Sequence, residues 1–313
     1  MEVDDILGQI EALKQELFSG KARNPTIGRH LTRLVGKGYR MKKISRWKRG
    51  DSFRSINWKL TLQTWPKKIY KIDKIETKEV PTILALDLSP STLVRFKGQE
   101  SKFLFMVQMM ATLAFTSMHT NDPVGLVAFG PIVNFFLPPR HGQKRIFHVV
   151  EMLVKGANDF YKTNDAGKPW TESGIDVNEC LDAVLGRIRQ QSAVFVLSDM
   201  SDVLCGRTAL NAETVEALAA RHQQNLTFML VDDANELAWS GGHGTIMTRN
   251  VRDGGLAEIK ARSAAAIRKE HQQKQETFRK QVEKLGGSVV VVSQNDPLDQ
   301  LANFFGSRKR AFS

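Results

Sequence analysis

Four short apolar runs, each about as long as a β-strand, constrain the fold of this 313-residue chain more than any other feature. A polar residue follows each run directly. A strand that is apolar at every position suits a sheet covered on both faces. Segments with helical spacing lie between the runs, and alternating strands and helices predict an α/β fold with a mostly parallel sheet and helices on both faces. The predicted strands are residues 82–86, 193–197, 226–231 and 289–292, and the predicted helices are residues 101–119, 143–154, 175–190 and 209–223.

Four further elements complete the expectation. Two apolar segments, 124–129 and 132–137, flank Gly130-Pro131 and predict a hairpin. Residues 255–285 read as one long polar helix that Gly286-Gly287 ends, and residues 297–305 as a final helix. Residues 3–18 carry Ile and Leu at helical spacing and predict an amphipathic helix.

The net charge of +12 is concentrated in one segment. Residues 21–78 hold 18 Lys and Arg against three acids, a net charge of +15, whereas residues 79–313 carry only +1 and residues 1–20 carry −4. These shifts predict three parts: an amphipathic helix over 1–20, a basic and β-rich or irregular module over 21–78, and the α/β domain over 79–313. Large apolar side chains in the module predict that it packs against the sheet domain. A strand is expected near residues 69–76.

The composition excludes several classes of protein. Hydrophobic residues make up 42% and charged residues 25% of the chain, which excludes disorder over most of it. Cys180 and Cys205 are the only cysteines, too few for a disulfide scaffold. No apolar run approaches the roughly 20 residues of a membrane span. The acidic start, Met1 to Asp5, is unlike a secretory signal, so a cytoplasmic location is expected.

Polar side chains gather where the predicted strands end. Asp87, Ser89 and Ser91 form a D-x-S-x-S pattern after the first strand, and Asp199 follows the second. Ligands of open α/β sheets collect at the carboxyl ends of strands. Carboxylate and hydroxyl oxygens are hard donors that suit Mg²⁺ or another divalent cation, with open positions for water or for a carboxylate of another molecule. The alternative is an ordinary turn, because Asp and Ser are common turn residues.

The order of these elements resembles the von Willebrand factor type A domain. In that domain the D-x-S-x-S pattern forms a metal-ion-dependent adhesion site (MIDAS), which binds an acidic residue of a partner through the metal. A second pattern, Gly50-Asp51-x-x-Arg54-x-Ile56-Asn57-Trp58, is similar to the G-D-x-x-R-x-I-D-W motif of the bacterial family called domain of unknown function 58. Ser198-Asp199 and the later Asp233-x-x-Glu236 also fit that family, and the likeness covers roughly residues 28–240.

The resemblance carries implications for the site and for partners. It implies that Asp87, Ser89, Ser91 and Asp199 hold Mg²⁺, and that Gly50, Asp51, Arg54 and Trp58 form a junction motif. The alternative for Asp51 and Arg54 is that they close a turn and brace the junction of the two parts. Members of this family are typically encoded beside MoxR-type AAA+ ATPases, so such an ATPase and an acidic protein target are the expected partners.

The sequence departs from the family pattern at three positions. Asn57 replaces the usual Asp, and Gln63 stands near a frequent Arg. Ile175 stands where the type A site takes a Thr ligand, and an isoleucine has no donor atom for a metal. Either Thr171 or Ser173 substitutes for that ligand, or the metal site is weakened.

The function expected from these observations is a non-catalytic adaptor that binds proteins through a divalent metal. The chain has no P-loop motif, and no spacing argues a Ser-His-Asp constellation, so no enzyme activity is predicted. The alternative is a binder of nucleic acid or of an acidic membrane surface through residues 21–78. Trp47, Trp58 and Trp65 lie among basic residues there, but no nucleic-acid-binding signature accompanies them. A hydrolase using the same divalent site is a more distant alternative.

Overall fold

A computed structural model describes twelve parts of the chain: Gly8 and residues 42–64, 68–74, 80–93, 101–119, 122–130, 135–164, 176–223, 225–232, 245–249, 256–260 and 264–293. The chain divides into two compact units, one of residues 37–79 and one of residues 1–36 together with 80–313. Among the helices described, none is both long and apolar enough to cross a membrane.

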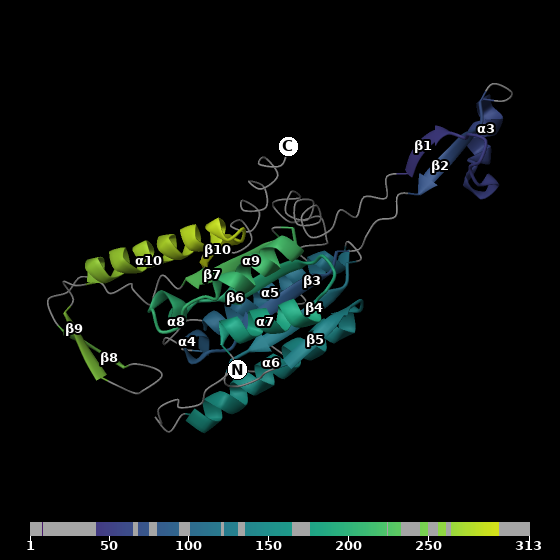
Figure 1. Cartoon of the computed structure of the whole chain (residues 1–313). Coiled ribbons are helices and arrows are strands. Elements are labelled where there is room, and N and C mark those ends of the chain that lie inside the picture. The colour runs from purple at the N-terminus through teal and green to yellow at the C-terminus, as the bar shows by residue number, and fades with distance from the viewer. Residues whose placement is uncertain are drawn as a thin grey trace. The chain divides into compact units, whose positions relative to one another are not determined.

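The larger unit is built on a six-stranded sheet with the order β10-β7-β6-β3-β4-β5 (Figure 1). All neighbours in this sheet pair in parallel except β4 and β5, which are antiparallel. The sheet confirms the predicted α/β class and is consistent with a type A-like or Rossmann-like fold. Its strands are β3 (Thr82–Asp87), β4 (Val124–Phe129), β5 (Phe135–Arg140), β6 (Ala193–Ser198), β7 (Leu226–Asp232) and β10 (Ser288–Ser293).

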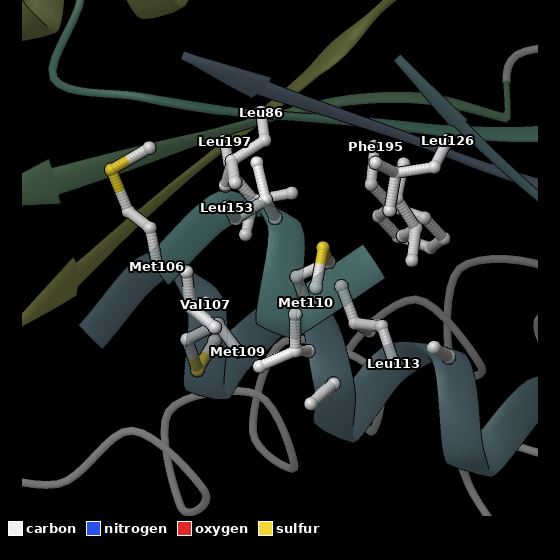
Figure 2. Close-up of a cluster of buried hydrophobic side chains, with 14 of the residues drawn as sticks. Leu86, Met106, Val107, Met109, Met110, Leu113, Leu126, Leu153, Phe195 and Leu197 are labelled. Carbon is white, nitrogen blue, oxygen red and sulfur yellow. The ribbon is translucent and has the colours of Figure 1, made fainter. Parts of the chain in front are cut away.

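Helices cover both faces of the sheet because alternate strand residues point to opposite sides. On β3, Leu84 and Leu86 pack in one core with the helices α5 (Lys102–His119) and α6 (Gln143–Asn164), and Figure 2 shows side chains of α5 filling the space below the sheet. Ile83 and Ala85 pack in a second core on the opposite face. That core includes residues of α7 (Val177–Arg187), α9 (Ala212–Arg221) and α10 (Ala264–Lys284).

The strands predicted over 82–86, 193–197, 226–231 and 289–292 and the helices predicted over 101–119, 175–190 and 209–223 are confirmed with small shifts at their ends, whereas α6 continues ten residues beyond the predicted end at residue 154. The second strand of the predicted hairpin is displaced by three residues, since β5 covers Phe135–Arg140. This edge strand contains Pro138 and Pro139, which sheets accept at an edge, where a backbone donor is not needed for a further strand. Two helices of four residues, α4 (Pro90–Leu93) and α8 (Ser201–Leu204), were not predicted.

The prediction of one helix over residues 255–285 is wrong at its start. Residues Leu256–Lys260 form the strand β9, which pairs antiparallel with β8 (Thr245–Arg249), and the helix α10 begins only at Ala264. The last three residues of β9, Glu258, Ile259 and Lys260, alternate charged and apolar side chains, and this period-2 pattern also suits a hairpin strand. The predicted helices over 3–18 and 297–305 lie outside the described residues, apart from Gly8.

The smaller unit contains a two-stranded antiparallel sheet, β1 (Lys42–Arg46) and β2 (Tyr70–Lys74), which confirms the strand predicted near residues 69–76. A 3₁₀ turn η1 (Phe53–Ser55) and a short helix α3 (Trp58–Thr64) connect the strands. The side chain of Asn57 accepts a hydrogen bond from the Leu60 backbone N–H at 3.2 Å at the start of α3. Asn and Asp cap helices about equally well, so Asn57 can serve the same local role as the family's Asp. That this module packs against the sheet domain stays a prediction.

We expect the central strand to be highly sensitive to truncation. Leu84 has no exposed side-chain area, so Leu84→Ala should lower the free energy of unfolding by about 2–5 kcal/mol. The matched variant Leu62→Ala alters a side chain that is 70% exposed and should change it by less than about 0.5 kcal/mol. Urea denaturation of both variants measures the difference, and equal effects would contradict the two-sided core.

Candidate functional site

The order in which the chain adds strands to the sheet reverses between β3 and β6. From β3 the chain passes through α5 to β4 on one side, and it later returns to place β6 on the other side of β3. At such a switch point the connections leave the carboxyl ends of two neighbouring strands in opposite directions, which opens a crevice between them. Asp87 is the last residue of β3, and Asp199 directly follows β6. Both carboxyl groups therefore belong to the edge where ligands of this fold class collect.

The D-x-S-x-S segment turns back on itself through its own side chains. Asp87 Oδ1 accepts a hydrogen bond from the Ser89 backbone N–H at 2.8 Å, and the hydroxyl oxygens of Ser89 and Ser91 lie 3.0 Å apart. The buried Thr92 hydroxyl donates to the Ser89 carbonyl at 2.8 Å, which holds the start of α4 against this turn. The oxygens of the three motif residues consequently face one another.

Asp199 joins the same cluster from β6. Its Oδ1 accepts hydrogen bonds from the Ser91 hydroxyl at 3.2 Å and from the Ser201 backbone N–H at 3.0 Å. The backbone of Met200, between them, has a left-handed φ of 50°, which non-glycine residues rarely adopt. This turn brings Ser201 back toward Asp199. The structure thus brings together all four predicted residues, and their role as metal ligands stays a prediction.

Three residues that the sequence did not single out as site residues complete the cluster. Lys102 Nζ forms an ion pair with Asp199 Oδ2 at 3.0 Å, and both side chains are about 5% exposed. The Ser198 hydroxyl donates to Asp87 Oδ2 at 2.5 Å, and the third is Thr92. The one available signal for Lys102 was its position as a lone charge directly before the apolar stretch Phe103–Val107.

The two carboxyl groups have opposite pKa shifts. Burial, and next the charge of Asp199, raise the pKa of Asp87 to about 7 against the hydrogen bonds from Ser198 and Ser89. Burial also acts to raise the pKa of Asp199, but the Lys102 ammonium and the hydrogen bonds from Ser201 outweigh it, so this pKa lies below its ordinary value. Without a further cation, the cluster therefore favours an ionised Asp199 beside an Asp87 that readily keeps its proton.

A third carboxylate ends the neighbouring strand. Asp232, the last residue of β7, lies 3.7 Å from His271 Nε2 of α10, measured from its Oδ1. The hydrogen bond from His271 is the largest of the influences that lower the pKa of Asp232, and the charge of Lys102 adds to it. The three adjacent parallel strands β3, β6 and β7 therefore each have a carboxyl group at their carboxyl end or directly after it, and Lys102 lowers the pKa of two of these groups, Asp199 and Asp232.

The junction motif has a local role within the smaller unit. Asp51 accepts a hydrogen bond from the Lys48 backbone N–H at 2.8 Å and forms an ion pair with Lys71 of β2 at 2.9 Å, and Lys71 is the first cause of its lowered pKa. Gly50 precedes it with a φ of 107°, a conformation that favours glycine. Asp51 therefore closes a turn and ties it to the strand. Arg54 in η1 and Trp58 in α3 are exposed.

The region of the expected threonine ligand is outside the described residues, which resume at Asp176. Thr171, Ser173 and Ile175 all fall in that gap. Asp176 caps α7 by accepting a hydrogen bond from the Glu179 backbone N–H at 2.9 Å. Asp176 therefore has a helix-capping role.

The chemistry of the donor set fits a hard divalent cation. Asp87, Ser89, Ser91 and Asp199 offer only carboxylate and hydroxyl oxygens, the ligands that Mg²⁺ accepts while keeping several waters. Within the described ranges no three or more His, Cys, Asp or Glu residues form a cluster that could hold a metal ion, so the serine hydroxyls are essential to this set. A bound cation would supply a centre to which a carboxylate of another molecule could bind.

Comparison with known families identifies the family of this chain. Residues 44–281 match the model of the family described as protein of unknown function DUF58. The chain belongs to this family. The match spans both units, so the DUF58 region includes the smaller unit from Ile44 onward as well as the strands that carry the cluster. Neither the curated proteins nor the solved structures give a significant match.

We expect one glycine to be essential for the position of the motif. A Cβ on Gly130 would lie 2.6 Å from the carbonyl carbon of Leu88, the residue between Asp87 and Ser89. Gly130→Ala should therefore reduce the free energy of unfolding by about 1–3 kcal/mol more than Gly142→Ala. Gly142 has a similar φ of 128° but open space around it, so it isolates the clash from backbone strain. Thermal or urea unfolding makes the comparison, and equal losses would contradict the close approach.

We also expect a pH signature of the buried Asp87 in chelator-treated protein. Because its pKa is raised, the folded state holds this proton more tightly than the unfolded chain, which favours folding at low pH and is lost as the pH rises from about 4 to about 7. Across this range, the stability of the wild type should fall relative to Asp87→Asn by about 1.4 kcal/mol per pKa unit. Relative to Asp199→Asn the fall should be smaller, because this variant keeps the buried Asp87 and loses only the neighbouring charge that helps to raise its pKa. Urea titrations at several pH values test this, and a constant difference for Asp87→Asn would contradict it.

Proposed function

We propose that this DUF58 protein is a non-catalytic adaptor that binds another protein through a divalent cation held by Asp87, Ser89, Ser91 and Asp199. The observation that carries the proposal is the meeting of these oxygen donors, from the ends of two adjacent parallel strands, at the switch point of the sheet. Ser89 and Ser91 would bind the cation directly. Asp87 and Asp199 would do so directly or through water.

The hydrogen bonds around the cluster support binding rather than turnover. Each of the two carboxyl groups is held by at least two donors: Asp87 by Ser89 and Ser198, and Asp199 by Ser91, Ser201 and Lys102. Groups held in this way are preorganised to orient a cation. A carboxylate that takes an open position on that cation would give a directional contact.

We further propose that a MoxR-type AAA+ ATPase is the working partner and that an acidic side chain of a protein target takes the open position on the cation. This part rests on the resemblance of the G-D-x-x-R-x-I-x-W motif to the family. The basic smaller unit suits the same role, because a positive surface raises association rates with an acidic partner through long-range attraction.

A second candidate function has its own supporting observation. In the smaller unit, Phe53 and Trp58 are 71% and 59% exposed, beside the exposed basic residues Arg54 and Lys59. Aromatic faces among positive charges stack on bases and sit at acidic interfaces. Binding of nucleic acid or of an acidic membrane surface through this unit is therefore the alternative, and its affinity would fall steeply with salt.

The two candidates predict different kinetic defects with a MoxR-type ATPase from the same organism immobilised on a surface. Asp87→Ala and EDTA should each abolish binding mainly by accelerating dissociation, because they remove the directional contact. Reversal of Lys42, Lys43, Lys48 and Arg49 to Glu should instead slow association and flatten its salt dependence. Circular dichroism confirms that each variant is folded.

The control is Asp182→Asn, which changes a carboxyl that accepts a hydrogen bond from Thr214, outside the cluster, and should leave binding unchanged. Binding that survives both Asp87→Ala and EDTA but is lost on charge reversal would overturn the metal-bridged adaptor in favour of the electrostatic binder. Direct titration of the purified protein with Mn²⁺ gives a separate measurement of the cation.

A further inference from the structure

We propose that Lys102 makes cation binding and partner-carboxylate binding depend on each other. The inference rests on the proposed function and concerns a residue outside the donor set. Lys102 would act as a fixed positive charge that weakens the cation's affinity for the free site and strengthens the affinity of the cation-loaded site for a carboxylate.

The position of Lys102 is unfavourable for a lysine in two respects, which its contact with Asp199 helps to offset. It is the first residue of α5, where the helix dipole disfavours a positive charge. Its side chain is 5% exposed, and burial of an ammonium group is costly unless it is paired. The side chain of Ser101, also buried, accepts a hydrogen bond from the Leu104 backbone N–H at 3.3 Å. This bond caps the start of α5 and fixes the position of the Lys102 backbone.

The ion pair occupies only part of Asp199. Lys102 contacts Oδ2 at 3.0 Å, whereas Oδ1 faces Ser91. A cation at the serines and Lys102 would therefore flank the same carboxylate from its two oxygens. Like charges so close in a buried site repel each other strongly, because the effective dielectric constant there is far below that of water.

The charges of the innermost cluster give the sign of the coupling. In the cation-loaded site, where the cation favours ionised carboxyl groups, Asp87, Asp199 and Lys102 sum to −1, so the site with its divalent cation carries +1 and an incoming carboxylate brings it to zero. Without Lys102, the cation alone would neutralise the site, and a carboxylate would find no excess charge. Asp232 and His271 lie beyond the innermost cluster, are each about one-third exposed, and are the same in every variant compared below.

The experiment measures Mn²⁺ affinity by calorimetry, with acetate as the probe carboxylate and chloride replacing it at equal ionic strength in the control. In the wild type, acetate should tighten Mn²⁺ binding. In chloride, Lys102→Met should bind Mn²⁺ at least about tenfold more tightly than the wild type does. The increase in Mn²⁺ affinity that acetate causes should be smaller in this variant than in the wild type.

Lys102→Met alone leaves Asp199 buried without its charge partner, which can destabilise the fold. A double variant avoids this problem. Lys102→Met with Asp199→Asn removes both charges and restores the innermost sum to that of the wild type. Acetate should then again increase the Mn²⁺ affinity, although the lysine is absent. Lys155→Met serves as the surface control, since it removes a positive charge paired with Glu151 on α6.

The outcomes separate the inference from the function on which it rests. Tighter Mn²⁺ binding with a smaller acetate effect in Lys102→Met, or a recovered acetate effect in the double variant, supports the coupling. A folded Lys102→Met protein with the Mn²⁺ dissociation constants of the wild type in acetate and in chloride overturns it while leaving the metal-bound adaptor in place. A double variant that binds Mn²⁺ without an acetate effect does the same, and if the double variant binds no Mn²⁺, Lys102→Met alone decides. A wild type that binds no Mn²⁺ overturns the adaptor itself.

Discussion

The burial of β3 on both faces is the constraint on which the rest of the structure depends. All six of its residues are buried, because cores lie above and below it and strands lie on both sides. A buried polar group needs a partner, and Thr82, the one hydroxyl along this strand, shares a hydrogen bond with Ser117 of α5 at 2.9 Å. Polar chemistry is therefore confined to the strand's end. Asp87 lies at that limit, still buried but within reach of the loop oxygens.

Much of this architecture is predictable from sequence because two-sided burial leaves a simple pattern. A strand with cores on both faces is apolar at nearly every position between its ends, so Thr82–Asp87 and Ala193–Ser198 were visible as short apolar runs. The hairpin β8–β9 was missed for the opposite reason. Leu256–Lys260 precedes a long polar helix, and five residues of mixed polarity are too few to separate a period of 2 from a period of 3.6.

The site was predictable in part, and the missing part has a physical cause. Asp87, Ser89 and Ser91 are close in sequence, and the parallel sheet places the end of β6 beside them, so Asp199 could be added from topology alone. Lys102 could not. Its contact with Asp199 joins the start of α5 to the end of β6 across 97 residues of sequence, and no pattern in the sequence pairs a lysine with this carboxylate. The motif therefore indicates the negative charges and the hydroxyls but not the built-in positive charge.

The two prolines of β5 have a consequence for how this protein can meet others. Pro138 and Pro139 lie in the outermost strand of the sheet and carry no backbone N–H. The N–H positions of consecutive strand residues point to opposite sides, so a guest strand that tried to extend the sheet at this border would find one donor missing at these two prolines, and proline on an edge strand protects against strand addition and aggregation. Association by backbone pairing is thus disfavoured along this side of the molecule. Recognition there must rely on side chains, whose identity can change without altering the sheet.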